Sequence, residues 1–162
     1  MKVRDATAAD AAEIERMIHE LVLYEGGQPG ILLFKEAQLA AALSGNPPRL
    51  RALIAEDEKG LAGFVSYTID FAIWSGGDVL RVDDVFVRER ARKSGAGTRL
   101  MLRIAELALA GGMTCRWEIE PANLGAQYFY GKFGVDVREK MVARWSEGAM
   151  RAALARPRDQ DT

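Results

Sequence analysis

The most constraining feature of this sequence is a strand pattern that leads through a short basic, glycine-containing loop into an amphipathic helix. Residues 79–87 have strand character, residues 92–97 read Arg-Lys-Ser-Gly-Ala-Gly, and residues 97–110 place apolar side chains at helical spacing. Free backbone N–H groups at a helix start, together with the helix dipole, favour negative charge there. The loop therefore predicts an anion-binding site, with a plain surface turn as the alternative.

Two common phosphate-binding loops do not fit these residues. A Walker loop requires Lys and then Ser or Thr after its last glycine, whereas Gly97 is followed by Thr98 and Arg99. A dinucleotide-binding loop needs a third small residue where this chain has Leu100, and the chain has too few parallel βαβ units for two mononucleotide halves. The sequence argues against both a nucleotide triphosphatase and a dinucleotide-dependent enzyme.

Bulk composition narrows the class of protein further. The chain has 162 residues, which suits one domain over residues 1–155, and we expect a disordered tail over residues 156–162. A net charge of -1 argues against a nucleic-acid partner, although basic residues cluster locally between Arg88 and Lys93. One cysteine and one histidine cannot form a zinc cluster, so no metal is expected. Neither a signal peptide nor a membrane span is recognisable, which predicts a cytoplasmic protein without a membrane partner.

Hydrophobic periodicity and turn residues predict the remaining elements. Thr7 and Asp10 resemble a capping box that opens the first helix, Asn123 caps a short helix, and Ser146 caps the last one. The expected strands are residues 2–5, 51–56, 61–71, 79–87, 115–120 and 135–145, and the expected helices follow Thr7 and cover residues 35–43, 97–110, 123–132 and 146–155. This order predicts an α/β fold with a mixed central sheet, an antiparallel meander plus a parallel β-α-β unit, flanked by helices.

The loop at residues 92–97 fits the Arg/Gln-x-x-Gly-x-Gly/Ala signature of the GNAT (Gcn5-related N-acetyltransferase) superfamily. The match extends beyond the loop: residues 3–10 resemble the family's first strand and helix cap, and Asn123, Tyr130 and Gly134 resemble its Asn-x6-Tyr-x3-Gly segment. Within the superfamily, residues 20–25, 83–87 and 128–130 look most like those of the diamine (spermidine/spermine) acetyltransferases. The resemblance covers roughly residues 2 to 146 and implies the GNAT fold, with acetyl-CoA as the acetyl donor.

The resemblance also implies which residues bind the donor. Backbone groups of one strand pair with the pantetheine arm, loop amides cradle the pyrophosphate, and an asparagine contacts the arm. In this chain the matching positions are Val85, Phe86 and Val87 for the strand, Arg92, Lys93, Ser94, Gly95, Ala96, Gly97 and Thr98 for the loop, and Asn123 for the arm. Asn123 is also explained by helix capping alone, and both roles are compatible.

Catalysis and amine binding are assigned in the same way. Tyr130 matches the residue that protonates or hydrogen-bonds the departing CoA thiolate, and its alternative is a packed core aromatic. The positions that hold the amine match Tyr24, Glu25, Asp83 and Asp84. Asp83 departs from the subfamily, which has a glutamate there, one methylene longer, so the resemblance does not fix substrate length or affinity. The alternatives are that Asp83 and Asp84 simply alternate on a strand, and that Glu118 or Glu120 is the base.

Together these residues predict an N-acetyltransferase that transfers acetyl to a primary amine by direct attack in a ternary complex. The first choice of substrate is a small polyamine or diamine. The alternatives are another small amine, a protein amine, or a catalytically silent acyl-CoA-binding module. The resemblance further implies a homodimer.

Overall fold

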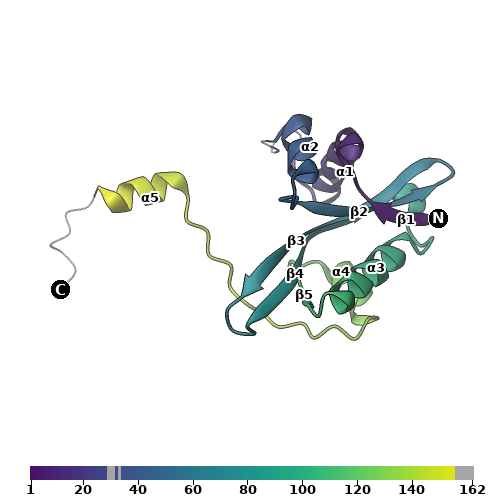
Figure 1. The fold of residues 1–162 in the computed structure, drawn as a ribbon. Coiled ribbons are helices and arrows are strands. Elements are labelled where there is room, and N and C mark those ends of the chain that lie inside the picture. Colours follow the sequence, from purple (N-terminus) through teal and green to yellow (C-terminus); the bar gives the residue numbers. More distant parts are fainter. Residues whose placement is uncertain (29–31, 33, 156–162) are drawn as a thin grey trace. The chain divides into compact units, whose positions relative to one another are not determined.

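The computed structural model of the chain describes residues 1–28, 32 and 34–155 (Figure 1). The chain separates into two compact units, Met1–Glu118 and Ile119–Thr162. The predicted disordered tail lies outside the described residues, and the single domain over residues 1–155 stays a prediction. Each helix in the described ranges is too short or too polar to cross a membrane.

The first unit is built on one mixed sheet of five strands in the order β1-β2-β3-β4-β5. The strands are β1 (Lys2–Asp5), β2 (Arg51–Asp57), β3 (Gly60–Ala72), β4 (Gly77–Val87) and β5 (Thr114–Arg116). The first four pair antiparallel, and β4 and β5 pair in parallel. This arrangement confirms the predicted α/β class, with the meander and the parallel unit sharing β4.

Helices cover both faces of this sheet (Figure 1). One face carries a 3-10 turn (Ala8–Asp10), α1 (Ala11–Tyr24) and α2 (Glu36–Ser44); the other carries α3 (Ala96–Ala110). The Asp10 carboxylate accepts hydrogen bonds from the Thr7 amide at 2.8 Å and the Thr7 hydroxyl at 3.0 Å, as the capping pattern predicted. Because both faces are covered, β2 reads as an apolar run: Leu53 enters the core under α3, and Ile54 enters the core under α1.

A close approach of β3 to β4 requires glycine at position 63. A Cβ atom on Gly63 would lie 2.5 Å from the carbonyl oxygen of Phe86 and 3.1 Å from the Cα of Val87. Both are backbone atoms that cannot rotate away. The absence of a side chain at Gly63 therefore allows β3 to lie this close to the last residues of β4.

The second unit contains α4 (Leu124–Gly131) and α5 (Glu147–Leu154). Asn123 Oδ1 accepts from the Ala126 amide at 2.9 Å, and Ser146 Oγ accepts from the Ala149 amide at 3.3 Å. Both predicted caps are confirmed. None of the residues of α5 is buried.

Two predicted strands differ from the structure. The strand expected over residues 115–120 is shorter and is paired with β4 only over Thr114–Arg116, with Arg81 as the last residue of β4 in register with it. The strand expected over residues 135–145 is absent, since the structure gives this segment no ladder partner among the described residues. Alternation of apolar and polar side chains indicates a strand only where a partner completes its hydrogen bonds.

Candidate active site

A β-bulge in β4 decides where the two adjacent aspartates point. Ser66 of β3 lies opposite Asp84, whereas the next residue, Tyr67, lies opposite Val82, so Asp83 is the extra residue. Ordinary strand alternation would send Asp83 and Asp84 to opposite faces. Instead, both carboxylates line one cavity of about 370 Å³. The alternative in which the pair merely alternates does not apply.

The cavity is lined by both apolar and polar side chains. The apolar residues come from α1, α2, the segment between α2 and β2, and the sheet, and the polar residues contribute one hydroxyl, one guanidinium and two carboxylates. The apolar lining residues are Ile14, Ile18, Leu39, Leu43, Leu50, Ala52 and Phe64, and the polar ones are Ser66, Arg81, Asp83 and Asp84. Such a cavity suits a small molecule that joins an aliphatic body to a charged group.

The pKa of the Asp84 carboxyl is raised above its usual value. Partial burial raises the pKa of the Asp84 carboxyl, and the negative charge of Asp83 raises it further. The Ser66 hydroxyl opposes this by donating to Asp84 Oδ2 at 3.1 Å, and it also accepts from the Asp84 amide at 3.1 Å. Asp84 is thus a stronger base than an ordinary aspartate, held in position by a buried serine.

Asp83 is paired within the protein. Arg81 donates to Asp83 Oδ1 through Nε at 3.2 Å and Nη2 at 3.0 Å. The sequence analysis did not single out Ser66 or Arg81. Arg81 could have been identified from the sequence, because it lies two residues before Asp83 and therefore on the same face of the strand. Ser66 had none, since its role depends on its register with β4.

The loop before α3 has the geometry of an anion site. Lys93 has φ 63° and Gly95 has φ 87°, so two residues of the loop adopt the left-handed conformation. The Arg99 amide makes the first helical hydrogen bond, to the Gly95 carbonyl at 3.0 Å. In the described part of the chain, the preceding amides of Ala96, Gly97 and Thr98 donate to no backbone carbonyl. They remain available to a ligand at the positive end of the α3 dipole.

Of the basic residues between Arg88 and Lys93, two have their charges paired with carboxylates elsewhere in the protein. Arg88 is bound by Glu13 at 2.6 Å and Glu20 at 2.8 Å, and Arg90 is bound by Asp57 at 2.6 Å. These ion pairs tie the end of β4 to α1 and the turn after it to β2. Within the described ranges, neither Arg92 nor Lys93 forms a salt bridge, so their charges stay available at the loop.

Tyr24 lies against the loop. The Arg92 guanidinium carbon is 4.1 Å from the centroid of the Tyr24 ring, a cation–π contact between the end of α1 and the loop. Arg92 Nε also donates to the Val87 carbonyl at 3.3 Å. Neither Tyr24 nor Glu25 belongs to the lining of the cavity that holds Asp83 and Asp84. The structure thus divides the four residues assigned to the amine between two places.

Just before the loop, β4 has no strand partner on the side that faces away from β3, within the described residues. β5 pairs with β4 only through Arg81, so Val85, Phe86 and Val87 have a ladder partner on the β3 side alone within the described residues. Their side chains pack in the two cores, and Phe86 is 4% exposed. What this edge offers a ligand is therefore backbone N–H and C=O groups, as in β-augmentation.

In the second unit, Tyr130 is 8% exposed, and burial raises the pKa of its phenol to about 12. The Phe129 ring lies edge-on to it, with centroids 5.1 Å apart. Tyr128, two residues away, is 73% exposed and has the Lys132 ammonium 4.4 Å from its ring centroid. Asn123 caps α4. Glu118 and Glu120 are both exposed and lie beyond the end of β5.

Residues 14–135 match the model of the Acetyltransferase (GNAT) family. The chain is 30% identical over 119 residues to thialysine N-epsilon-acetyltransferase from Mus musculus, which covers 68% of this chain and 69% of the relative. It is 29% identical over 121 residues to spermidine/spermine N(1)-acetyltransferase-like protein 1 from Homo sapiens, covering 70% of this chain and 17% of that protein.

Solved structures share the fold. An integron cassette protein from the mobile metagenome of V. cholerae superposes with a TM-score of 0.76 at 24% identity, covering 96% of this chain and 98% of that one. An aminoglycoside acetyltransferase from an uncultured soil metagenomic sample, in complex with sisomicin, superposes with a TM-score of 0.74 at 14% identity, covering 90% and 94%.

Proposed function

The chain belongs to the GNAT family of acetyltransferases and is an acetyl-CoA-dependent N-acetyltransferase; from that premise we propose that it acetylates the primary amine of a small molecule held at Asp84. The observation that carries this proposal is the continuity of β4. The strand presents the acidic cavity at its bulge, an open backbone edge over its last three residues, and the anion-binding loop just beyond its end.

The loop and the edge of β4 are proposed to bind the donor. The free amides of Ala96, Gly97 and Thr98 suit the pyrophosphate, with Arg92 and Lys93 adding charge. Open space surrounds the position of a Cβ on Gly95, with no atom within 4 Å, so phosphate oxygens can approach the backbone there. Val85 to Val87 are proposed to pair with the pantetheine arm. The donor supplies the acetyl group as a thioester.

Asp84 is proposed to receive the amine. Its carboxylate attracts the ammonium, and its raised pKa makes it a better acceptor for the proton that the amine must lose before attack. A water molecule can relay that proton. The amine nitrogen then forms a bond to the thioester carbon, and the carbon–sulfur bond breaks to release CoA thiolate. Asp84 keeps the proton until the product leaves.

Tyr130 is proposed to serve the departing sulfur. With a pKa of about 12, its phenol keeps its proton at neutral pH. A thiol has a pKa of about 8.5, so complete proton transfer from a phenol of about 12 is uphill by about 5 kcal/mol. We therefore assign Tyr130 a hydrogen bond to the developing thiolate, which strengthens as charge builds on sulfur.

Several amines fit this scheme. A small polyamine or diamine is the class predicted from the sequence, and spermidine and spermine occur in the name of one relative. Thialysine occurs in the name of another and is an amino acid that also carries a primary amine. A cavity of about 370 Å³ is in the size range of small-molecule sites, which favours a small amine.

The test is thiol release from acetyl-CoA by the full chain with a panel of small amines and one lysine-containing peptide. Turnover with a small amine supports the proposal. Turnover with the peptide alone contradicts the small-molecule assignment. CoA binding without turnover of any amine would identify a silent acyl-CoA-binding module instead.

A further inference from the structure

We propose that Arg88 is a positioning residue for the donor site, because it fixes the end of β4 and the loop after it to helix α1. This inference rests on the proposed function, namely that the edge of β4 from Val85 to Val87 and the loop at residues 92–98 bind acetyl-CoA. Arg88 lies between these two segments, directly after Val87 and four residues before Arg92.

The guanidinium of Arg88 is engaged by protein groups at all three of its nitrogens. Nε and Nη2 donate to Glu20 Oε1 at 3.0 and 2.8 Å. Nη1 lies 2.6 Å from Glu13 Oε1 and donates to the Leu61 carbonyl at 3.0 Å. The side chain is only 16% exposed, so solvent screens these contacts less than it screens an ordinary surface ion pair. We therefore expect Arg88 to act on the donor through the elements that it joins.

Helix α1 is attached to the donor segment at two points. Glu13 and Glu20 are seven residues apart and therefore lie on one face of the helix, which Arg88 binds. Tyr24 lies four residues beyond Glu20, one turn further along that face. Its ring centroid is 4.1 Å from the guanidinium carbon of Arg92, at the start of the loop. Both contacts hold the segment from the end of β4 into the loop against the same helix.

Arg90 makes similar contacts without reaching α1. It lies in the 3-10 turn Glu89–Ala91, directly beyond Arg88, and pairs with Asp57 of β2 at 2.6 Å. It also donates to the Leu61 carbonyl, at 2.9 Å. Arg90 thus shares with Arg88 a place before the loop, an ion pair and the contact with Leu61, and it differs in being attached to β2. This makes Arg90→Gln a matched control for Arg88→Gln.

CoA binding separates a positioning role from an effect of charge alone. CoA is an anion, so loss of a nearby positive charge weakens its binding and loss of a nearby negative charge strengthens it. Arg88→Gln and Glu20→Gln change the local charge in opposite directions, yet both break the contact between Arg88 and α1. A positioning role predicts weaker CoA binding in both variants. Glu20 is the better choice for this test, because Glu13 is shared with Arg16 of the same helix.

The experiment is calorimetric titration of CoA into the full chain, with thermal melting to confirm that each variant is folded. We expect the Kd for CoA to rise by on the order of tenfold in Arg88→Gln and by at least roughly threefold in Glu20→Gln. Arg90→Gln should stay within about twofold of wild type. In steady-state kinetics, the KM for acetyl-CoA should rise in Arg88→Gln while kcat stays within about twofold, since saturating donor compensates for weaker binding.

Two results would overturn the proposal. If Glu20→Gln binds CoA as well as wild type or more tightly, Arg88 acts by its charge and not by its contact with α1. If Arg90→Gln weakens CoA binding as much as Arg88→Gln does, the effect is a general one on the turn. Should Arg88→Gln fail to fold, the comparison of Glu20→Gln with Arg90→Gln decides the question.

Failure of the donor site itself gives a different result. The wild-type protein would then bind no CoA, or would bind it with the same affinity after Gly95→Ala, a substitution within the loop. Either outcome overturns the donor assignment and the role of Arg88 together. A loss of affinity in Gly95→Ala, combined with wild-type affinity in both Arg88→Gln and Glu20→Gln, keeps the donor site and overturns the role of Arg88 alone.

Discussion

Burial raises the pKa of the Asp84 carboxyl and that of the Tyr130 phenol, with opposite consequences for chemistry. Asp84 must be ionised to attract an ammonium, so a raised pKa limits its use at low pH and improves it as a base. Tyr130 must keep its proton to donate to sulfur, so a raised pKa secures that state across the physiological range.

Tyr130→Phe removes the hydroxyl and keeps the ring, so packing and acetyl-CoA affinity should survive. We expect kcat to fall by roughly 10²-fold, because the lost hydrogen bond strengthens only as the thiolate develops. The KM for acetyl-CoA should change little. Steady-state kinetics on both variants measure this, with Tyr128→Phe as the control because Tyr128 is exposed. Small and equal losses in the two variants would mean that the Tyr130 hydroxyl takes no part in catalysis.

Asp84→Asn should change activity and stability in opposite directions. Its kcat/KM for the amine should fall by at least roughly tenfold, and the wild-type acid limb, which we place above the usual aspartate range, should disappear. A raised folded-state pKa means that ionised Asp84 costs stability, increasingly so as the pH rises through that pKa. The variant should therefore melt higher than wild type at pH 7, and the difference should vanish below the pKa of an unfolded aspartate. Lower melting at pH 7 would refute this reading of Asp84.

Tyr24→Leu tests whether Tyr24, at the end of α1, contributes to the binding of acetyl-CoA or to the binding of the amine. The ring supports Arg92 at the donor loop, so its loss should raise the KM for acetyl-CoA by a few-fold and leave the KM for the amine unchanged. A cation–π contact of about 1 kcal/mol corresponds to roughly fivefold. The reverse pattern, an effect on the amine alone, would restore the amine-binding role expected from the sequence.

At the scale of elements, the proposed site is formed by the run from β3 through β4 and the loop into α3. Gly63 allows β3 and β4 to lie close together. The bulge puts Asp84 on the same face as Arg81 and Asp83, so that three charged side chains line one cavity. The last three residues of β4, which β5 does not pair with, are followed by the loop. The loop itself holds Lys93 and Gly95 in the left-handed region. A non-glycine residue held there indicates that its surroundings impose the conformation, as at many binding sites.

Gly95→Ala should raise the dissociation constant for CoA by at least roughly tenfold, measured by calorimetry, because the left-handed conformation becomes costly and the loop relaxes. Gly60→Ala is the matched control. It has φ 99° in the β2–β3 turn and, like Gly95, no atom within 4 Å of an added Cβ. It should cost about 1 kcal/mol of stability without changing CoA affinity. Equal CoA affinity in the two variants would remove the loop from the donor site.

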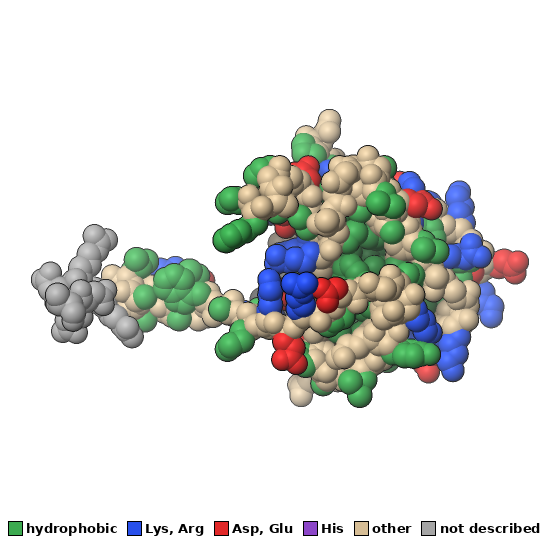
Figure 2. Space-filling model, turned by 90° about the horizontal axis from the view of Figure 1, so that it is seen from below, with side chains coloured by type: hydrophobic (Ala, Val, Ile, Leu, Met, Phe, Trp, Pro, Cys, Tyr) green, Lys and Arg blue, Asp and Glu red, His purple; other side chains and the backbone are tan. Residues whose placement is uncertain are grey.

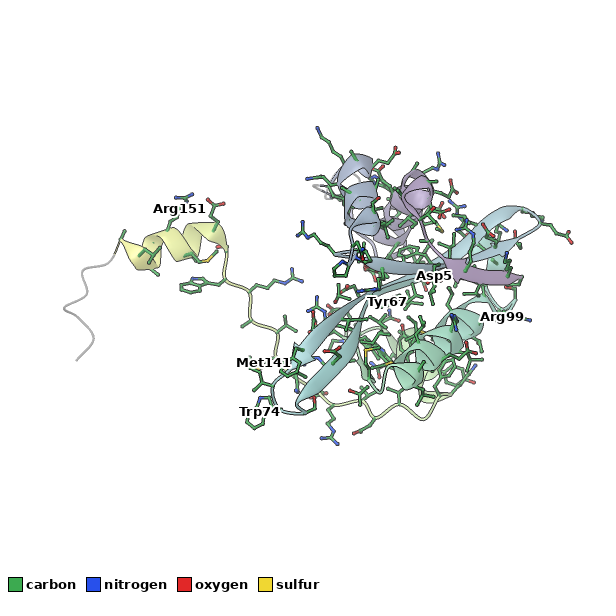
Figure 3. All side chains as sticks on the ribbon, in the orientation of Figure 1. Asp5, Tyr67, Trp74, Arg99, Met141 and Arg151 are labelled. Carbon is green, nitrogen blue, oxygen red and sulfur yellow. The ribbon has the colours of Figure 1, made fainter. Side chains whose placement is uncertain are left out.

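At the scale of the whole chain, charge and exposed apolar surface indicate different kinds of partner. On the face drawn in Figure 2, basic and acidic side chains lie beside one another rather than forming a field of one sign, which suits small molecules better than nucleic acid. Exposed apolar side chains are numerous. Trp74 stands at the tip of the β3–β4 hairpin (Figure 3), and the second unit exposes Val137, Met141, Val142, Trp145 and Leu154.

We expect a homodimer, with a mass near twice 17.8 kDa in light scattering at micromolar concentration. Exposed apolar residues of this number usually mark an association surface. The double substitution Met141→Glu and Trp145→Glu should shift the mass toward the monomer, whereas Leu109→Glu, at an exposed position of α3, should not. A wild-type protein that stays monomeric would contradict the dimer.

The sequence by itself determined the features that depend on neighbouring residues. The caps at Thr7, Asn123 and Ser146, the helix after Gly95 and the antiparallel meander follow from local hydrogen bonding, turn residues and periodicity. The backbone geometry of the loop over residues 92–97 was predictable for the same reason, since its amides and its glycines lie within one short segment.

Tertiary structure decided what depends on partners far apart in the chain. The bulge opposite Ser66 puts Asp84 on the same face of β4 as Arg81 and Asp83, so that all three line one cavity. The contact of Tyr24 with Arg92 joins the end of α1 to the loop across 67 intervening residues. Residues 135–145 carry a strand pattern and form no strand. Register and pairing are set by which segments meet, and a one-residue shift in register redirects every side chain that follows it.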